Sequence, residues 1–231
     1  MDQQRAIAES VKNSIIGTVR GTGEIVNAVT ETVSDSLSTA LRGAGDVGQA
    51  LTGAVSDVAC GVIQGTSEAG GDLGAAAKGA VIGTLRGAKE AGGAAIDTVG
   101  TTVEHLVKTT AQVGGDIGDA ARQAVEGTVL GAKGVGINAL EAAGAAAGAA
   151  VKAAAQAGAD VGLAAKSAVD GAISAAKDLG VDASEAGAAA AVGALKAAGQ
   201  IGAEAFEQVT RAATGVISGV KVVAREPLRK G

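Results

Sequence analysis

The sequence contains almost no large aromatic side chains. Its 231 residues include no Trp, no Tyr and a single Phe, Phe206. Aromatic residues usually supply the largest buried areas of a protein interior. The Ala, Gly and Val that are abundant here gain less free energy on burial. We therefore expect small side chains that pack closely against many neighbours.

Cysteine, histidine and proline are equally scarce, with one residue of each: Cys60, His105 and Pro227. A single cysteine excludes an internal disulfide, and no spacing of metal ligands is present. His105 follows Glu104 in a polar stretch, so we expect it at the surface, and we expect Cys60 to be an inert small residue. The sequence predicts no catalytic, cofactor-binding or metal-binding residues, and hence no enzyme and no cofactor.

The charge balance and the apolar runs exclude further classes. The 19 Lys and Arg against 24 Asp and Glu give a net charge of −5, which does not indicate nucleic-acid binding. No small-molecule substrate is indicated either. The N-terminal MDQQRAIAES lacks the design of a signal peptide. Charges interrupt every candidate membrane span. We expect a cytoplasmic protein, or one bound peripherally to a membrane or inclusion surface.

The most informative positive feature is a spacing of 22 residues. Ten bulky aliphatic residues, which we call the aliphatic ridge, keep this interval: Val19, Leu41, Ile63, Leu85, Val107, Val129, Val151, Ile173, Leu195 and Ile217. Eight glycines, which we call the ladder glycines, keep it in another register: Gly48, Gly70, Gly92, Gly114, Gly136, Gly158, Gly180 and Gly202. Twenty-two residues make six turns at about 3.67 residues per turn. The repeat predicts an all-α fold without β-sheet, with one repetitive region over 1–225 and a short basic tail over 226–231.

The ladder glycines allow two interpretations. Several are followed two residues later by Asp or Asn, as in Gly70-Gly-Asp72 and Gly136-Ile-Asn138, which is typical of a helix end and a new start. That interpretation gives helices of about 20 residues folded up and down. The apolar stripe nevertheless keeps its phase across each glycine. We therefore favour long, kinked amphipathic helices, folded as hairpins or assembled laterally, in which the ladder glycines allow close helix packing.

The repeats also support a resemblance. Stretches such as VKTTAQVGGDIGDAARQAVEG (107–127) and AVEGTVLGAKGVG (124–136) lie in unbroken 11- and 22-residue amphipathic periodicity. This pattern resembles the class that includes exchangeable apolipoproteins, synucleins, perilipin-type droplet coats and late-embryogenesis-abundant proteins. The resemblance implies interface binding, or helix formation on adsorption or drying. It is one of pattern, so no functional residue is transferred.

These observations predict a non-enzymatic structural protein that assembles with itself into a filament-like or coat-like structure. Its apolar stripe would contact an apolar core or lipid. The alternative is a stress-protective or lipid-adsorbing chain that becomes helical only on binding or drying. Ice binding is a third hypothesis, which would need Thr in one column throughout; Thr18, Thr84 and Thr128 share a column that the intervening rows interrupt.

Overall fold

The computed structural model describes residues 2–19, 25–41, 47–91 and 95–224. The described residues form ten helices followed by one β-hairpin. The helices are α1 (Asp2–Val19), α2 (Ile25–Leu41), α3 (Val47–Glu68), α4 (Leu73–Glu90), α5 (Ala95–Gln112), α6 (Ile117–Val135), α7 (Ala139–Gln156), α8 (Val161–Leu179), α9 (Ala183–Ile201) and α10 (Ala203–Ala212). The strands are β1 (Gly215–Ile217) and β2 (Val220–Val222).

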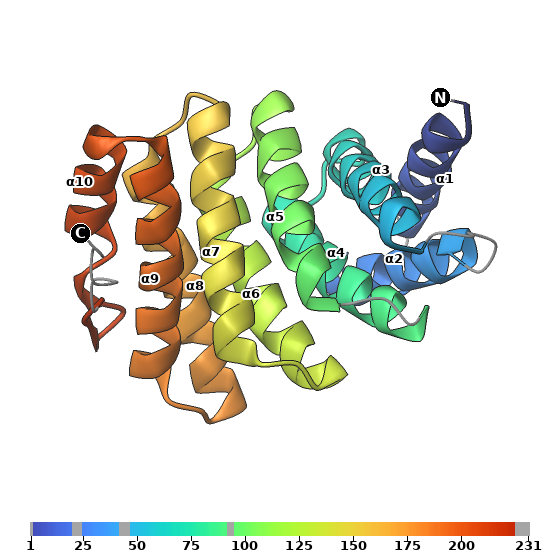
Figure 1. The fold of residues 1–231 in the computed structure, drawn as a ribbon. Coiled ribbons are helices and arrows are strands. Elements are labelled where there is room, and N and C mark those ends of the chain that lie inside the picture. The colour runs from blue at the N-terminus through green and yellow to red at the C-terminus, as the bar shows by residue number, and fades with distance from the viewer. Residues whose placement is uncertain (1, 20–24, 42–46, 92–94, 225–231) are drawn as a thin grey trace.

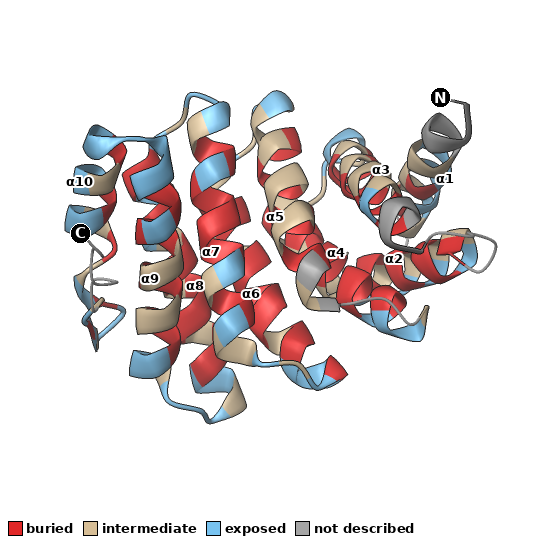
Figure 2. Ribbon diagram, in the orientation of Figure 1, coloured by how far each residue is buried: buried red, intermediate tan, exposed pale blue. Residues whose placement is uncertain are grey.

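The helices stack in two layers. Consecutive helices run in opposite directions, and each helix packs most extensively beside the helix two positions further along the chain (Figure 1). Helices α1, α3, α5, α7 and α9 form one layer, and α2, α4, α6, α8 and α10 form the other. Neighbours within a layer are therefore parallel, and the buried residues lie where the layers meet (Figure 2).

Most ladder glycines end a helix. The φ angles of Gly70, Gly114, Gly136, Gly158 and Gly180 lie between 66° and 78°, a left-handed conformation that glycine adopts without steric cost. At Gly136 the next amide, of Ile137, donates to the carbonyl of Ala132 at 3.0 Å, the bond that closes a Schellman motif. The prediction of long helices that cross these glycines is therefore wrong. The structure has the alternative, short helices folded up and down.

Acidic and amide side chains start the helices that follow. Asp72, Asp116, Asn138, Asp160 and Asp182 are N-cap residues whose side-chain oxygens accept bonds from backbone amides in the first turn. Each satisfies a donor that has no partner within its helix. One Gly-x-Asp or Gly-x-Asn triplet thus ends one helix and begins the next. Helices α5 to α9 begin at Ala95, Ile117, Ala139, Val161 and Ala183, at intervals of 22 residues.

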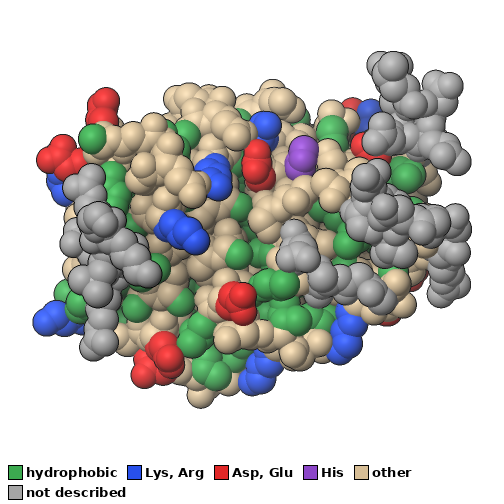
Figure 3. Space-filling view, in the orientation of Figure 1, with side chains coloured by type: hydrophobic (Ala, Val, Ile, Leu, Met, Phe, Trp, Pro, Cys, Tyr) green, Lys and Arg blue, Asp and Glu red, His purple; other side chains and the backbone are tan. Residues whose placement is uncertain are grey.

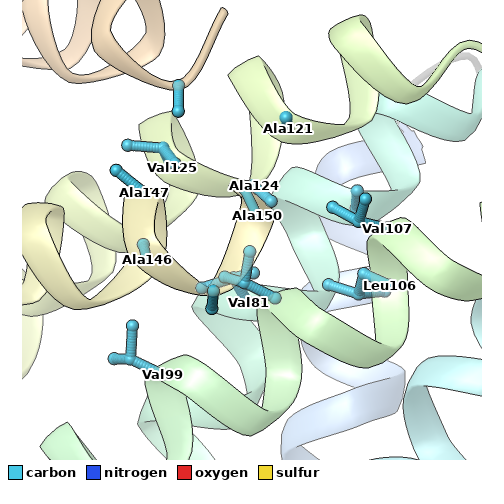
Figure 4. Packing of buried hydrophobic residues seen from close by; sticks show 14 of the residues in the cluster. Val81, Val99, Leu106, Val107, Ala121, Ala124, Val125, Ala146, Ala147 and Ala150 are labelled. Carbon is cyan, nitrogen blue, oxygen red and sulfur yellow. The ribbon is translucent and has the colours of Figure 1, made fainter. Parts of the chain in front are cut away.

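The aliphatic ridge is the core between the layers. Leu41, Ile63, Leu85, Val107, Val129, Val151, Ile173, Leu195 and Ile217 are each at most 4% exposed. The side chain of Val19 lies outside the described set. Around Val107, small residues such as Ala121 and Ala150 complete the packing (Figure 4). The residues that the periodicity singles out therefore face the inside of this chain.

Another set of glycines brings helices together within a layer. Gly83, Gly127 and Gly171 are 44 residues apart; a Cβ atom added at Gly127 would lie 2.6 Å from the carbonyl oxygen of Lys78 on α4. A Cβ atom at Gly193 on α9 would overlap the carbonyl oxygen of Gly144 on α7. Parallel neighbours therefore touch backbone to backbone, which larger side chains would prevent.

The packing role predicted for the ladder glycines is thus performed elsewhere. A Cβ atom built at six of them would meet nothing within 4 Å: Gly70, Gly114, Gly136, Gly158, Gly180 and Gly202. Gly48 lies in the first turn of α3, and Gly92 falls outside the described residues. The glycines that end helices and the glycines that pack helices are different sets.

The C-terminal part of the repeat is not helical. Strands β1 and β2 pair antiparallel, with Ile217 opposite Val220, and positive φ angles at Ser218 and Gly219 make the turn between them. The prediction of an all-helical chain without β-sheet is wrong here. Ile217 and Val222 are buried, so the hairpin still contributes ridge-like side chains to the core. Pro227 and the predicted tail over 226–231 lie outside the described residues.

Candidate functional site

The strongest concentration of reactive groups lies between α3 and α5. The hydroxyl oxygen of Ser56 is 3.2 Å from Nδ1 of His105, although the two residues are 49 positions apart in sequence. Asp57 acts on the charge of His105, and also on that of Cys60. His105 is half-buried rather than exposed as the sequence analysis expected. Nothing local in the sequence indicates this grouping, because it depends on which helices become neighbours.

The chemistry of this group does not favour catalysis. Burial lowers the pKa of His105 and raises the pKa of Cys60, so the thiol stays protonated at neutral pH and is a weak nucleophile. Burial also raises the pKa of Asp57. In a charge-relay triad the imidazole uses one nitrogen for the acid and the other for the nucleophile. Here Ser56 occupies Nδ1, the nitrogen that the acid would need. The group is better described as a polar contact between two helices.

A shallow groove crosses the outer face of the odd-numbered layer. It has a volume of about 900 Å³ and is lined by α5, α7, α9 and Val223. Its floor consists of small side chains, chiefly Gly144, Ala145 and Gly148 of α7 and Ala189 and Gly193 of α9. The close approach of these two helices leaves a surface from which few large side chains protrude. We call this surface the α7–α9 face.

Charged side chains border the groove in two rows. Glu141 and Glu185 occupy equivalent positions, 44 residues apart, near the N-termini of α7 and α9. Lys152 and Lys196, also 44 residues apart, lie 11 residues further along the same helices. Basic and acidic side chains accordingly collect at different ends of this layer (Figure 3). All four are exposed, and no ion pair joins any of them to another described residue.

Charges on the other layer are used within the chain. Lys78 of α4 forms an ion pair with Glu126 of α6, with 2.6 Å between Nζ and Oε1. Arg122 of α6 pairs with Asp119 at 2.9 Å and with Glu126 at 3.4 Å. The side chain of Glu126 is only 7% exposed, so this network is largely shielded from water. These charges stabilise the packing of neighbouring helices.

Three further lysines bind the ends of neighbouring elements. Lys89 donates to the carbonyl oxygen of Val135 at 2.8 Å, and Lys133 donates to that of Leu179 at 3.3 Å. A lysine at a helix C-terminus satisfies a free carbonyl and complements the helix dipole. The contrast between the layers leaves the α7–α9 face as the site with unused polar groups.

Other classes of site are not apparent in the described part of the chain. There, no group of three or more His, Cys, Asp or Glu side chains is arranged to hold a metal ion. None of the described helices combines the length and apolar character needed to cross a membrane. The chain matches no known protein family, and a search of curated proteins finds no similar sequence.

Proposed function

We propose that the chain is a non-enzymatic structural protein that associates with copies of itself through the α7–α9 face. The observation that carries the proposal is the pair of unpaired charge rows beside a floor of Ala and Gly. Exposed charges without partners and a flat surface of small side chains together suit a protein contact. A substrate pocket would instead be deeper and would hold converging polar groups.

The proposal does not include growth of a filament from the C-terminal end. There α10 and the hairpin lie against α8 and α9 and turn exposed polar residues outward, including Glu204, Glu207 and Arg211. A polar terminal element of this kind prevents end-to-end stacking in helical-repeat proteins. Association through a side face gives closed assemblies instead.

Sedimentation equilibrium over a wide range of protein concentration tests the proposal. We expect the mean mass to rise from one chain to a small multiple as concentration increases. The association should weaken when salt is raised, because exposed charges contribute to it. A constant mass of one chain up to the solubility limit would contradict self-association.

The lipid-adsorbing alternative makes a different demand on the chain. The aliphatic ridge would have to leave the core and face lipid, which requires the two layers to separate. Circular dichroism distinguishes the two ideas. High helicity in plain buffer, unchanged by vesicles, supports the folded scaffold, whereas helicity that appears only with vesicles or on drying supports adsorption.

A further inference from the structure

We infer that two copies pair through the α7–α9 face about a two-fold axis that lies in the interface and runs across the helices. This inference rests on the proposed self-association and specifies its geometry. It starts from the separation of the charge rows. Eleven residues make three helical turns, so Glu141 and Lys152 lie on the same side of α7, about 16 Å apart along its axis.

The order of the charges decides the orientation of the second copy. In α9, Glu185 and Lys196 repeat the arrangement of α7, and α7 and α9 are parallel, so the acidic row and the basic row lie at opposite ends of the face. Parallel pairing would place acid against acid. Antiparallel pairing places each acidic row against the partner's basic row, and a two-fold axis does this for both rows at once.

The surface between the rows allows close contact. On α7 the intervening groove residues are Gly144, Ala145, Gly148 and Ala149. On α9 they are Ala188, Ala189, Val192 and Gly193. Only Val192 carries a branched side chain, so a second copy can bring its own small residues close. The charge rows can then meet across the interface without steric obstruction.

Charge reversal tests the pairing. The first variant, Lys152→Glu with Lys196→Glu, has an acidic face, and the second, Glu141→Lys with Glu185→Lys, has a basic face. Each variant should bind itself at least about tenfold more weakly than wild type, because like charges would then meet. A one-to-one mixture should recover association as a mixed pair, detectable by native mass spectrometry.

The matched control reverses two exposed charges on the other layer, Arg86→Glu with Lys166→Glu. It changes the net charge as much as the first variant does, and we expect it to associate like wild type. Because Glu141 and Glu185 lie in first turns, where acids stabilise a helix, the fold of the second variant is checked by circular dichroism. If that variant does not fold, the first variant and the control still decide the test.

The outcomes separate this inference from the proposed function. Weakened variants, a normal control and recovery in the mixture support antiparallel pairing. Self-association of wild type that neither variant alters would overturn this pairing and leave self-association standing. Wild type that stays a single chain at every concentration would overturn both.

Discussion

At the scale of single residues, glycine has two separate roles. Where φ is positive it ends a helix, as at Gly136, and where backbones touch it leaves room for a carbonyl group, as at Gly193. Both kinds recur in the repeat, so periodicity alone does not separate them. The difference depends on which helices become neighbours.

The packing role predicts a large effect at Gly193. Gly193→Ala places a methyl group against the backbone of Gly144, so α7 and α9 must move apart. We expect a loss of about 1–3 kcal/mol in the free energy of unfolding, measured by urea denaturation. Gly199→Ala in the same helix is the control. Its nearest neighbour would be a ring carbon of Phe206 at 3.7 Å, an ordinary contact. A loss at Gly199 as large as at Gly193 would argue against close backbone packing.

The polar contact between α3 and α5 predicts a dependence on pH. Burial lowers the pKa of His105 in the folded chain below its ordinary value of 6.5, so the unfolded chain binds the proton more readily. The stability that this neutral histidine contributes is present above about pH 6.5 and is lost as pH falls towards the lower, folded-state pKa. Denaturation at about pH 7.5 and about pH 5.5 should show a larger loss for wild type than for His105→Gln.

The raised pKa of Asp57 acts in the opposite direction. The folded chain holds that proton more readily than the unfolded chain, so Asp57 destabilises the fold as pH rises from 3.8 through its folded-state pKa. Comparison with His105→Gln isolates the histidine from this carboxylate. Equal pH dependence in wild type and variant would contradict the assigned role of His105.

At the scale of elements, the Gly-x-Asp triplets set the helix boundaries. The glycine closes a Schellman motif and the acid caps the next helix, so the chain reverses within a few residues. We expect Gly136→Ala to cost about 1–2 kcal/mol, because a side chain there must adopt the left-handed conformation. Gly134→Ala, two residues earlier on an exposed part of α6, should be neutral or stabilise by up to about 1 kcal/mol. Thermal melts of both variants measure the difference, and equal melting temperatures would contradict the termination role.

The sequence was sufficient to predict helical structure and the ridge, but not the helix lengths. Leu85 and Val129 were correctly singled out because bulky residues at a helical interval must share one side. The unbroken phase across Gly114 and Gly158 favoured continuous helices. That phase survives because each helix with its turn has the same length as its neighbours, so short helices and long ones give the same pattern.

The hairpin and the polar contact could not be predicted. Residues 215–222 carry the aliphatic spacing of the repeat, yet β-branched residues and two turn residues suit a short strand pair at the end of the stack. Ser56 and His105 meet only because α3 and α5 are neighbours in one layer. The charge rows were visible as repeated residues, but their separation from the paired charges required the structure.

At the scale of the whole molecule, a chain without aromatic anchors reaches a compact form through contact number. The core between the layers is built from Ala and Val, and backbone contacts within each layer replace side-chain volume. This arrangement leaves one layer with its charges used internally and the other with charges free for a partner. The proposed association follows from that asymmetry.

Disulfide trapping tests this account most directly. In a Cys60→Ser background, Ala145→Cys places one thiol on the exposed floor of the α7–α9 face, between the two charge rows. A residue near a two-fold axis approaches its own copy. We predict rapid formation of covalent dimers under mild oxidation, and little with Lys166→Cys on the other layer. Equal trapping at the two positions, or none at Ala145, would contradict the account.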